Sequence, residues 1–398
     1  MKTKLIAGAC CALLAGCVVG PDYEAPVMET GADWVQGTEP GEPVVDNWWE
    51  QFGDEQLTAL VLQAHATNIS VRASYANIAR ARALRSLSGS RNGPVLDVGG
   101  SVTRRKQSAN GPLPVDEIPA IDAYQTIYDT GFDAAWELDL FGGNRRRNEA
   151  ADARIDQAVA QAADFRLAVG AEVARAYLEL RGAQREFDAV EESVAVLDER
   201  ARLLATGAAA GEYTTGDVSR AQSELAANRA RLPALEAQVR DLAMVIAVLL
   251  GKLPESVLPL ASSPPPSAPA LSPLPVGQRA DVLLRRADVR AAERALAAAT
   301  ADSGVAHAER FPKLGLSGNA GFQALDAGDL TDSDSVFWGI APVISWRVLD
   351  GGRVQAEIAA SEAEVVLAAL EYERTVLQAL ADAEQALSRY QFSLGITR

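Results

Sequence analysis

The chain repeats one pattern of elements twice, and this internal repeat limits the folds that it can adopt. In the first half, Phe141 to Asn144 reads Phe-Gly-Gly-Asn and follows an alternating apolar stretch. In the second half, Asp350 to Arg353 reads Asp-Gly-Gly-Arg in the same setting, at an offset of 209 residues (350 − 141). Helical patterns over 57–85 and 281–309 precede these stretches, and long alanine-rich helical patterns follow them. Each half is therefore predicted to contain a helix, two strands and a second helix.

Residues of the predicted strands alternate between apolar and polar, so each strand has one face of each kind. In the first half, one face carries Phe132, Ala134, Trp136, Leu138 and Leu140, and the other carries Asp133, Ala135, Glu137 and Asp139. In the second half, the apolar face recurs in Leu314, Leu316, Ala320 and Phe322, and then in Trp338, Ile340, Pro342, Ile344, Trp346 and Val348. This pattern is typical either of strands in a membrane barrel or of a soluble antiparallel sheet packed on a core.

Four strands are too few to close a barrel in a membrane. Open strand edges in lipid would leave backbone N–H and C=O groups without hydrogen-bond partners. If the apolar faces contact lipid, several copies of the chain must share one barrel. Three copies would supply about twelve strands, within the range known for such barrels.

The helical pattern of 145–205 is much longer than a globular domain requires. It contains only two glycines, Gly170 and Gly182, and about 60 helical residues would reach roughly 90 Å. Its apolar stripe is thin and built mostly from alanine, so the helix needs neighbours to be stable in water. After a glycine-containing loop, a return helix is expected over 217–250, with an irregularity at Pro233. The proline-rich stretch 254–275 then reads as an extended connector.

The N-terminus has the features of a bacterial lipoprotein signal. Lys2 and Lys4 precede an apolar stretch that is too short to span a bilayer. Leu-Ala-Gly-Cys, ending at Cys17, matches the lipobox, which makes Cys17 the acylated first residue of the mature chain. Val18, in place of the aspartate that retains lipoproteins at the inner membrane, favours the outer membrane. The alternative is a plain signal peptide with a chance cysteine. With Cys10 and Cys11 removed in the signal, no intramolecular disulfide is expected.

Composition and motifs argue against nucleic-acid binding and against catalysis. A formal net charge of -16 leaves no basic stripe to neutralise phosphates, and the run from Arg145 to Arg147 is too short to change this. The histidines, His65 and His307, lie in opposite halves, and neither has a metal-ligand partner at a suitable spacing. The glycine pairs 142–143 and 351–352 lack the third glycine of a dinucleotide fingerprint. We therefore expect no enzyme activity and no cofactor.

With this arrangement the chain resembles the outer-membrane factors of tripartite efflux pumps, and most closely their lipoprotein, NodT-like branch. The resemblance runs from Cys17 to the last residue. It rests on the order and spacing of short matches, which are the lipobox with Val19 to Tyr23; Trp49, Phe52, Asp54 and Leu57; Trp136 to Gly142; Gly211, Asp217, Val218, Arg220 and Ala221; Leu249 to Gly251; Arg285, Arg286 and Asp288 to Arg290; Phe311 and Pro312; and Asp350 to Arg353.

The resemblance implies a mixed α and β membrane protein in which a long α-helical periplasmic barrel joins a transmembrane β-barrel completed by trimerisation. It implies a passive exit duct for drugs or other small solutes, located in the outer membrane and extending into the periplasm. The expected partners are two further copies of the chain, a periplasmic adaptor, an inner-membrane transporter of the RND type and outer-membrane lipid. The alternative is a lipid-anchored periplasmic coiled-coil scaffold without a pore.

Three groups of residues are predicted to carry these roles besides Cys17. Adaptor docking is assigned to Gly207, Gly211, Tyr213, Gly216 and Asp217 in the loop between the long helix and its return. An acidic lumen that favours cations is assigned to Asp133, Glu137 and Asp139. The turns from barrel to tunnel are assigned to Gly142, Gly143, Gly351 and Gly352.

The predicted organisation has five segments. A signal peptide (1–16) and a lipidated extended segment (17–55) precede the first repeat (56–251), a proline-rich connector (252–279) and the second repeat (280–398). Two departures from the family pattern are expected. Ala287 stands where proline is usual, which should loosen only a helix start. By the repeat offset, Leu250 would correspond to position 459, so roughly the last 60 residues of the second repeat, with its tip and return helix, are expected to be missing.

Overall fold

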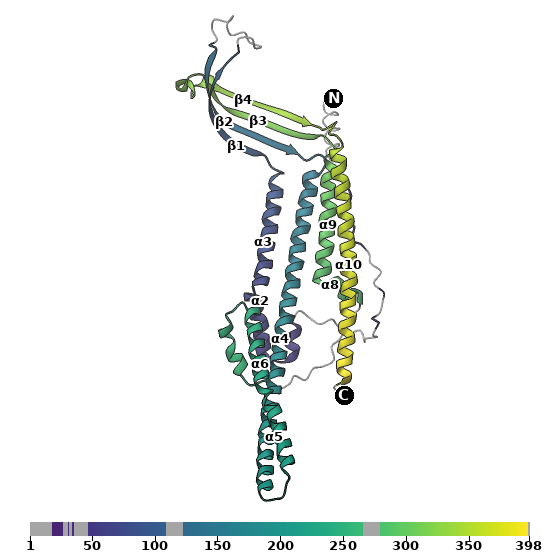
Figure 1. Ribbon diagram of the computed structural model, residues 1–398. Coiled ribbons are helices and arrows are strands. Elements are labelled where there is room, and N and C mark those ends of the chain that lie inside the picture. Colours follow the sequence, from purple (N-terminus) through teal and green to yellow (C-terminus); the bar gives the residue numbers. More distant parts are fainter. Residues whose placement is uncertain are drawn as a thin grey trace. The chain divides into compact units, whose positions relative to one another are not determined.

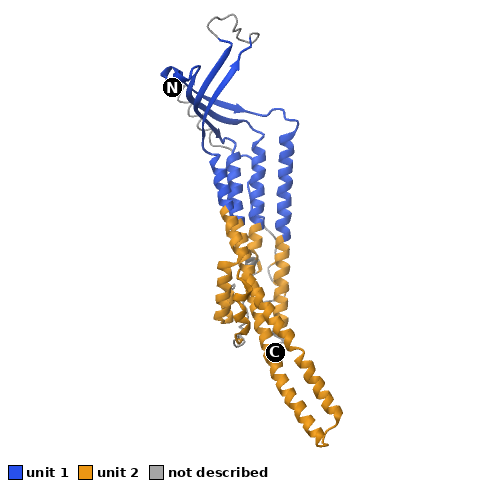
Figure 2. Cartoon of the chain, turned by 60° about the vertical axis from the view of Figure 1, so that its left-hand side comes forward, with its two compact units in different colours: residues 1–28, 80–157, 292–374 blue, residues 29–79, 158–291, 375–398 orange. Residues whose placement is uncertain are grey.

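The computed structural model describes residues 18–26, 31, 34–35, 47–108, 122–265 and 279–396. It divides into two compact units (Figure 2). Unit 1 comprises Met1–Met28, Arg80–Gln157 and Ala292–Arg374, and unit 2 comprises Glu29–Ala79, Ala158–Ala291 and Thr375–Arg398. Four helices contribute residues to both units, so each unit is discontinuous in sequence.

The predicted order of helix, strand, strand, helix is present in both halves (Figure 1). The first half contains α2 (Glu55–Thr67), α3 (Ile69–Ser90), β1 (Val95–Lys106), β2 (Tyr124–Leu138), α4 (Gly143–Ala209), α5 (Thr215–Arg229) and α6 (Leu232–Leu249). The second half contains α8 (Arg279–Arg285), α9 (Ala287–Ala308), β3 (Lys313–Ala324), β4 (Val336–Ser345) and α10 (Arg353–Ile396). A short helix α7 (Leu258–Ser262) and several 3-10 turns, including Trp48–Phe52, complete the described elements.

Two helices predicted as continuous are divided by residues that make their own polar contacts. Asn68 has extended backbone and separates α2 from α3. Its side-chain oxygen accepts the backbone N–H of Ser70 at 2.8 Å, and its amide nitrogen donates to the carbonyl of Leu249 at 2.7 Å. Arg286 separates α8 from α9 and pairs with Asp288. The Asn68 side chain competes for backbone groups in this way, which ends a helix that the apolar period alone would continue.

The long helix α4 spans 67 residues without interruption at its glycines. Gly170 instead allows the ring of His65 on α2 to lie close to α4, because a Cβ at Gly170 would be 3.0 Å from Nε2 of His65. Nε2 of His65 lies 3.0 Å from the carbonyl oxygen of Arg166. Burial lowers the pKa of the His65 imidazole. Pro233 stands in the first turn of α6, after the break from α5, so the predicted irregularity is confirmed.

The core of unit 2 forms around the middle of α4. Val173, Tyr177 and Leu180 pack against Leu57 and Val61 of α2, and these five side chains are almost fully buried together with residues of α6. The other α4 residues in this core are mostly small, namely Ala174, Ala176 and Ala183. Close packing of alanine faces explains how a helix with a thin apolar stripe is held by its neighbours.

The four strands form one antiparallel sheet in the order β1-β2-β3-β4 (Figure 1). The two halves of the repeat therefore meet at the pairing of β2 with β3. The strands end earlier than predicted, since β2 ends at Leu138 and β4 at Ser345. Within the described part of the chain, no helix is both long enough and apolar enough to cross a bilayer.

Candidate functional site

One face of the sheet is apolar across all four strands. Phe132 on β2 lies opposite Val98 of β1 and Ala320 of β3, and Ala320 in turn lies opposite Trp338 of β4. Every apolar residue predicted for one face, and located in a strand, falls on this side by register. Many of these side chains are exposed in the single chain, with Trp338 at 76% and Ile340 at 67%. A continuous exposed face of this size is typical of a surface that contacts lipid or another protein.

The opposite face of the same sheet is polar. Asp133 lies between Asp97 of β1 and Asn319 of β3. Glu137 lies two pleat repeats further along β2, opposite Gly315 of β3. On the same face, Asp129 accepts a hydrogen bond from the side chain of Gln323 at 2.9 Å. Asp133 and Glu137 therefore share the face that the sequence predicts.

Two glycines bring the backbones of β2 and β3 unusually close on the polar face. Gly131 and Gly321 are register partners. A Cβ on Gly321 would lie 2.3 Å from the carbonyl oxygen of Thr130, and one on Gly131 would lie 2.6 Å from that of Ala320. In β1, Gly99 is the register partner of Gly131, but nothing lies within 4 Å of a Cβ built there. A side chain is therefore excluded at Gly131 and Gly321 in the two central strands, but not at Gly99 in the edge strand β1.

Strands β1 and β4 are the edges of the sheet. Each pairs with one neighbour, β2 and β3 respectively, among the described residues. Both carry exposed apolar side chains, among them Val98 at 72% and Ile344 at 72%. An edge that is long and apolar is a template for pairing with a further strand.

Each sheet-to-helix junction is fixed by an aspartate that caps the following helix. Asp139 accepts the backbone N–H of Asn144 at 3.1 Å and of Arg145 at 2.9 Å. Asp350 accepts those of Gly352 and Val354 at 3.0 Å each, and these hydrogen bonds lower its pKa. Asp139 was predicted on the polar strand face. That placement is wrong, because β2 has already ended and its carboxylate caps α4.

The predicted glycine turns lie at these junctions. Gly142, Gly351 and Gly352 have positive φ angles of 80°, 67° and 87°, whereas Gly143 is the first residue of α4. Residues other than glycine rarely adopt a positive φ, which explains the glycines at these three positions. The rings of Phe141 and Phe311 stack at 4.6 Å between the two halves of the repeat. Both halves of the repeat also contain a tryptophan whose indole N–H donates to a backbone carbonyl. Trp136 donates to the carbonyl of Asn92, and Trp346 donates to the carbonyl of Arg310.

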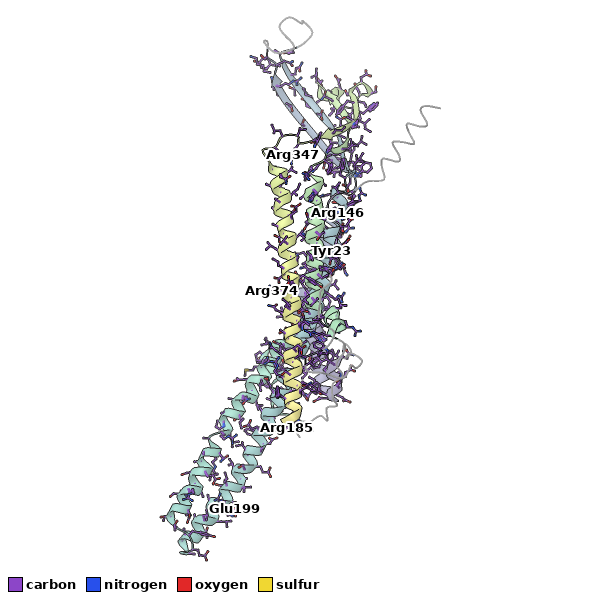
Figure 3. The ribbon with its side chains drawn as sticks, turned by 90° about the vertical axis from the view of Figure 1, so that its right-hand side faces the viewer. Tyr23, Arg146, Arg185, Glu199, Arg347 and Arg374 are labelled. Atoms are coloured by element: carbon purple, nitrogen blue, oxygen red, sulfur yellow. The ribbon has the colours of Figure 1, made fainter. Side chains whose placement is uncertain are left out.

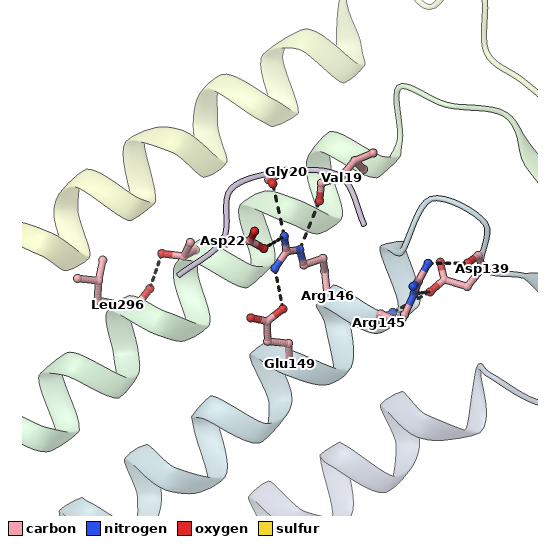
Figure 4. Close-up of polar contacts among 9 residues, drawn as sticks. Val19, Gly20, Asp22, Asp139, Arg145, Arg146, Glu149 and Leu296 are labelled. Carbon is pink, nitrogen blue, oxygen red and sulfur yellow. Dashed lines mark hydrogen bonds and ion pairs between the residues drawn. The ribbon is translucent and has the colours of Figure 1, made fainter. Parts of the chain in front are cut away.

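The residues that follow Cys17 contact α9 and the start of α4 (Figure 4). Cys17 itself is outside the described residues. Arg146, which is 4% exposed, donates to the carbonyls of Val19 and Gly20 and to the carboxylate of Asp22 at 2.5 Å. Figure 4 shows its guanidinium beneath this segment, with Glu149 on the other side. The matching residues Val19 to Tyr23 thus have a physical role that the sequence did not reveal.

The hairpin of α4 and α5 is closed by a compact turn. The ring of Tyr213 lies against Gly207, where a Cβ would be 2.5 Å from it. Gly211 has φ +81°, and Thr214 and Asp217 form a capping box at the start of α5. The hydrogen bonds from Thr214 lower the pKa of Asp217. Gly216 has an ordinary φ and room for a side chain, with a Cβ 3.5 Å from Oγ1 of Thr214.

Ion pairs join the two helices behind this turn. Arg200 pairs with Glu224 at 3.1 Å and Asp198 with Arg229 at 2.6 Å. Figure 3 shows side chains such as Glu199 projecting from this hairpin. The side chains of the two ion pairs are about half exposed, so each pair contributes at most about 1 kcal/mol to the free energy of unfolding. Among the residues that the structure describes, no three His, Cys, Asp or Glu side chains are placed to hold a metal ion.

Comparison with known proteins relates the chain to one family. The family model for outer membrane efflux proteins matches residues 60–252 and 279–395. Nodulation protein T of Rhizobium leguminosarum bv. trifolii is 32% identical over 387 residues, covering 95% of this chain and 80% of that protein. The toluene efflux pump outer membrane protein TtgF of Pseudomonas putida is 29% identical over 402 residues, covering 98% and 82%.

Solved structures give the same relationship. The outer-membrane channel OprN superposes with a TM-score of 0.86 at 36% identity, covering 94% of this chain and 83% of that one. The open state of the Neisseria gonorrhoeae MtrE outer membrane channel gives 0.81 at 25% identity, covering 95% and 83%. The predicted family and fold class, an α-helical barrel with a β domain, are thereby confirmed. This chain belongs to the outer membrane efflux protein family.

Proposed function

We propose that this chain is one subunit of a passive outer-membrane duct through which drugs or other small solutes leave the periplasm, and that it performs no chemistry of its own. The observation that carries the proposal is the sheet, with one continuous apolar face and one polar face. Strands of this kind separate lipid from water when they enclose a pore. The related proteins named as efflux pump outer membrane proteins support the same activity.

The pore is completed by three copies of the chain. The edge strands β1 and β4 would pair between neighbouring copies, so that every backbone group in the lipid has a partner. The coiled-coil scaffold without a pore is disfavoured, because it would leave Trp338 and Ile340 exposed to water. Native mass spectrometry of the detergent-extracted protein should give three times the mass of the acylated mature chain. A monomer that is soluble without detergent after removal of the anchor would contradict the proposal.

The polar sheet face would line the duct and favour cations. Asp133 and Glu137 project from it without an ion-pair partner among the described residues. We predict that the wild type, in planar bilayers under a KCl gradient, gives a reversal potential on the cation-selective side. Asp133→Asn with Glu137→Gln should move it towards zero, because six carboxylates would be lost from a trimer. Replacing the capping Asp139 by Asn is the matched control and should change selectivity least. Anion preference in the wild type would refute the acidic lumen.

The tip formed by Gly207, Gly211, Tyr213, Gly216 and Asp217 would dock the adaptor. We predict that Gly211→Val abolishes resistance to exported drugs while the protein still reaches the outer membrane, because valine is strained at φ +81° and would distort the turn. Gly211→Asn is the matched control, since asparagine tolerates this conformation and should retain most activity. Resistance should be measured at equal protein abundance in cells that supply the adaptor and an RND-type transporter. Unchanged resistance in Gly211→Val would count against the docking role.

Cys17 would be acylated and anchor the subunit to the outer membrane. Radiolabelled palmitate should enter the wild-type chain and not Cys17→Ser. The observation that supports this site is the set of contacts made by the residues that follow the cysteine. Val19 donates its backbone N–H to the carbonyl of Phe141 and accepts a hydrogen bond from Arg146, which would hold an anchor attached next to it close to the folded body.

A further inference from the structure

The segment Val18 to Tyr23, which we name the strap, is fastened to the folded body along its whole length. At its start, Val19 donates its backbone N–H to the carbonyl of Phe141 at 3.2 Å. Val18 covers Gly142, where a Cβ would lie 2.9 Å from Cγ1 of the valine. At its end, the hydroxyl of Tyr23 donates to Glu293, and the guanidinium of Arg294 lies 5.5 Å from the centre of its ring.

The middle of the strap is set between two helices and a buried cation. Gly20 has φ +89°, and a Cβ there would lie 2.5 Å from Cα of Gly304 on α9. A Cβ on Gly304 would in turn lie 2.9 Å from the side-chain carbons of Arg146. Arg146 therefore fills the space beneath the strap and hydrogen-bonds Val19, Gly20 and Asp22 from there. All of these residues belong to unit 1.

We propose that Arg146 is a positioning residue for the membrane anchor. It fastens the strap so that the acyl chains leave the protein beside the turn from β2 to α4, at Gly142, rather than from a loose leader. The observation that carries this step is the position of Val18, the residue after the lipobox cysteine, which lies against Gly142. The partner of this arrangement is the lipid surface at the level where the sheet ends. The anchoring half of the proposal rests on acylation of Cys17, whereas the fastening of the strap does not.

Arg146 suits this task because it is buried. A guanidinium presents several donors in a rigid fork, and here they reach two carbonyls and two carboxylates at once. Arg145, on the same turn of α4, is exposed and pairs with Asp139 instead. Removing each arginine in turn therefore separates the loss of strap contacts from the loss of a charge at the start of α4.

The experiment measures the mobility of the strap with a spin label on Glu24→Cys, an exposed position next to Tyr23. In the purified full-length trimer we expect a broad, restricted spectrum. Arg146→Met should give a narrow spectrum with a correlation time of about 1 ns, typical of an exposed flexible segment. Arg145→Met should resemble the wild type. A label on Glu364→Cys of α10 should be unaffected by either change, which shows that the body remains folded.

A second variant disturbs the contact between the strap and α9. Gly20→Ala would place its Cβ against Gly304 and should mobilise the label as Arg146→Met does, without altering any helix. Cys17→Ser is combined with Cys10→Ala and Cys11→Ala, so that a signal left uncleaved carries no thiol for the label. This variant should keep the label restricted, because protein contacts and not the acyl group hold the strap. A restricted spectrum in Arg146→Met, or a mobile one in Cys17→Ser, would overturn the fastening role.

Palmitate labelling of the same samples separates acylation of Cys17 from the fastening of the strap by Arg146. If palmitate is incorporated and Arg146→Met mobilises the spin label, both acylation and fastening are supported. Absent palmitate with the same spin-label result would remove the anchor at Cys17 and leave the strap as a clamp of the junction.

Discussion

Replacing Ile340 by arginine should abolish assembly of the protein in the outer membrane. Ile340 lies in the middle of β4 on the apolar face and is 67% exposed in the single chain. An arginine on the lipid face near the middle of a membrane barrel costs about 2–4 kcal/mol. In the proposed trimer three such residues would enter the same barrel, so the penalty is comparable with the whole stability of a typical domain. The measurement is the fraction of SDS-resistant trimer in outer-membrane preparations, with the urea midpoint of any folded remainder.

Ala341→Arg is the matched control for this change. Ala341 is the next residue along β4 and points to the polar face, opposite Ser317. An arginine there would extend into the proposed lumen, and we expect near-normal trimer and an altered reversal potential. The pair also tests which face contacts lipid. If Ala341→Arg prevented assembly and Ile340→Arg did not, the assignment of the two faces would be reversed.

The faces of the sheet could be predicted from the sequence because alternation is a local property. Phe132, Ala320 and Trp338 were each placed on an apolar side from their own strand, and the register shows that these sides are the same side. The pairing of β2 with β3 joins residues nearly 200 positions apart and depends on geometry that alternation does not encode.

Asp139 shows where a local pattern misleads. The alternation of β2 continues through Asp139, although the strand stops at Leu138. An aspartate a few residues before a long helical pattern is also a helix-capping signal, and in the structure capping prevails. Asp350, which also precedes a long helix although the repeat aligns it with Phe141 and not with Asp139, has the same capping role in the second half.

The strap could not be found from sequence patterns. Arg146 and Asp22 are 124 residues apart, and Arg146 belongs to a run of three arginines that would ordinarily be a solvated helix start. Arg146 alone of the three is buried, by contacts with the strap and with Gly304 of α9. The sequence offers one signal, the small residues Gly20 and Gly304, and their meaning depends on knowing that they touch.

The closeness of β2 and β3 leads to the second large effect. Gly321→Ala should destabilise the sheet, because its Cβ would lie 2.3 Å from the carbonyl oxygen of Thr130 and 2.7 Å from Cα of Gly131. Both atoms belong to backbone, which cannot move aside as a side chain can. Overpacking of this kind costs about 1–3 kcal/mol per site. Repeated in three subunits, it should lower the temperature at which the trimer dissociates in SDS by many degrees, which a heat-modifiability gel measures.

Gly99→Ala is the control with the same chemistry at the same level of the sheet. Its Cβ meets nothing within 4 Å, so the change should be neutral or slightly stabilising through reduced freedom of the unfolded chain. Gly131→Ala should resemble Gly321→Ala, because its Cβ would lie 2.6 Å from the carbonyl of Ala320. The double variant should cost less than the sum of the two single changes, since both force apart the same pair of strands. Equal dissociation temperatures for Gly321→Ala and Gly99→Ala would show that the close contact between β2 and β3 does not limit the stability of the sheet.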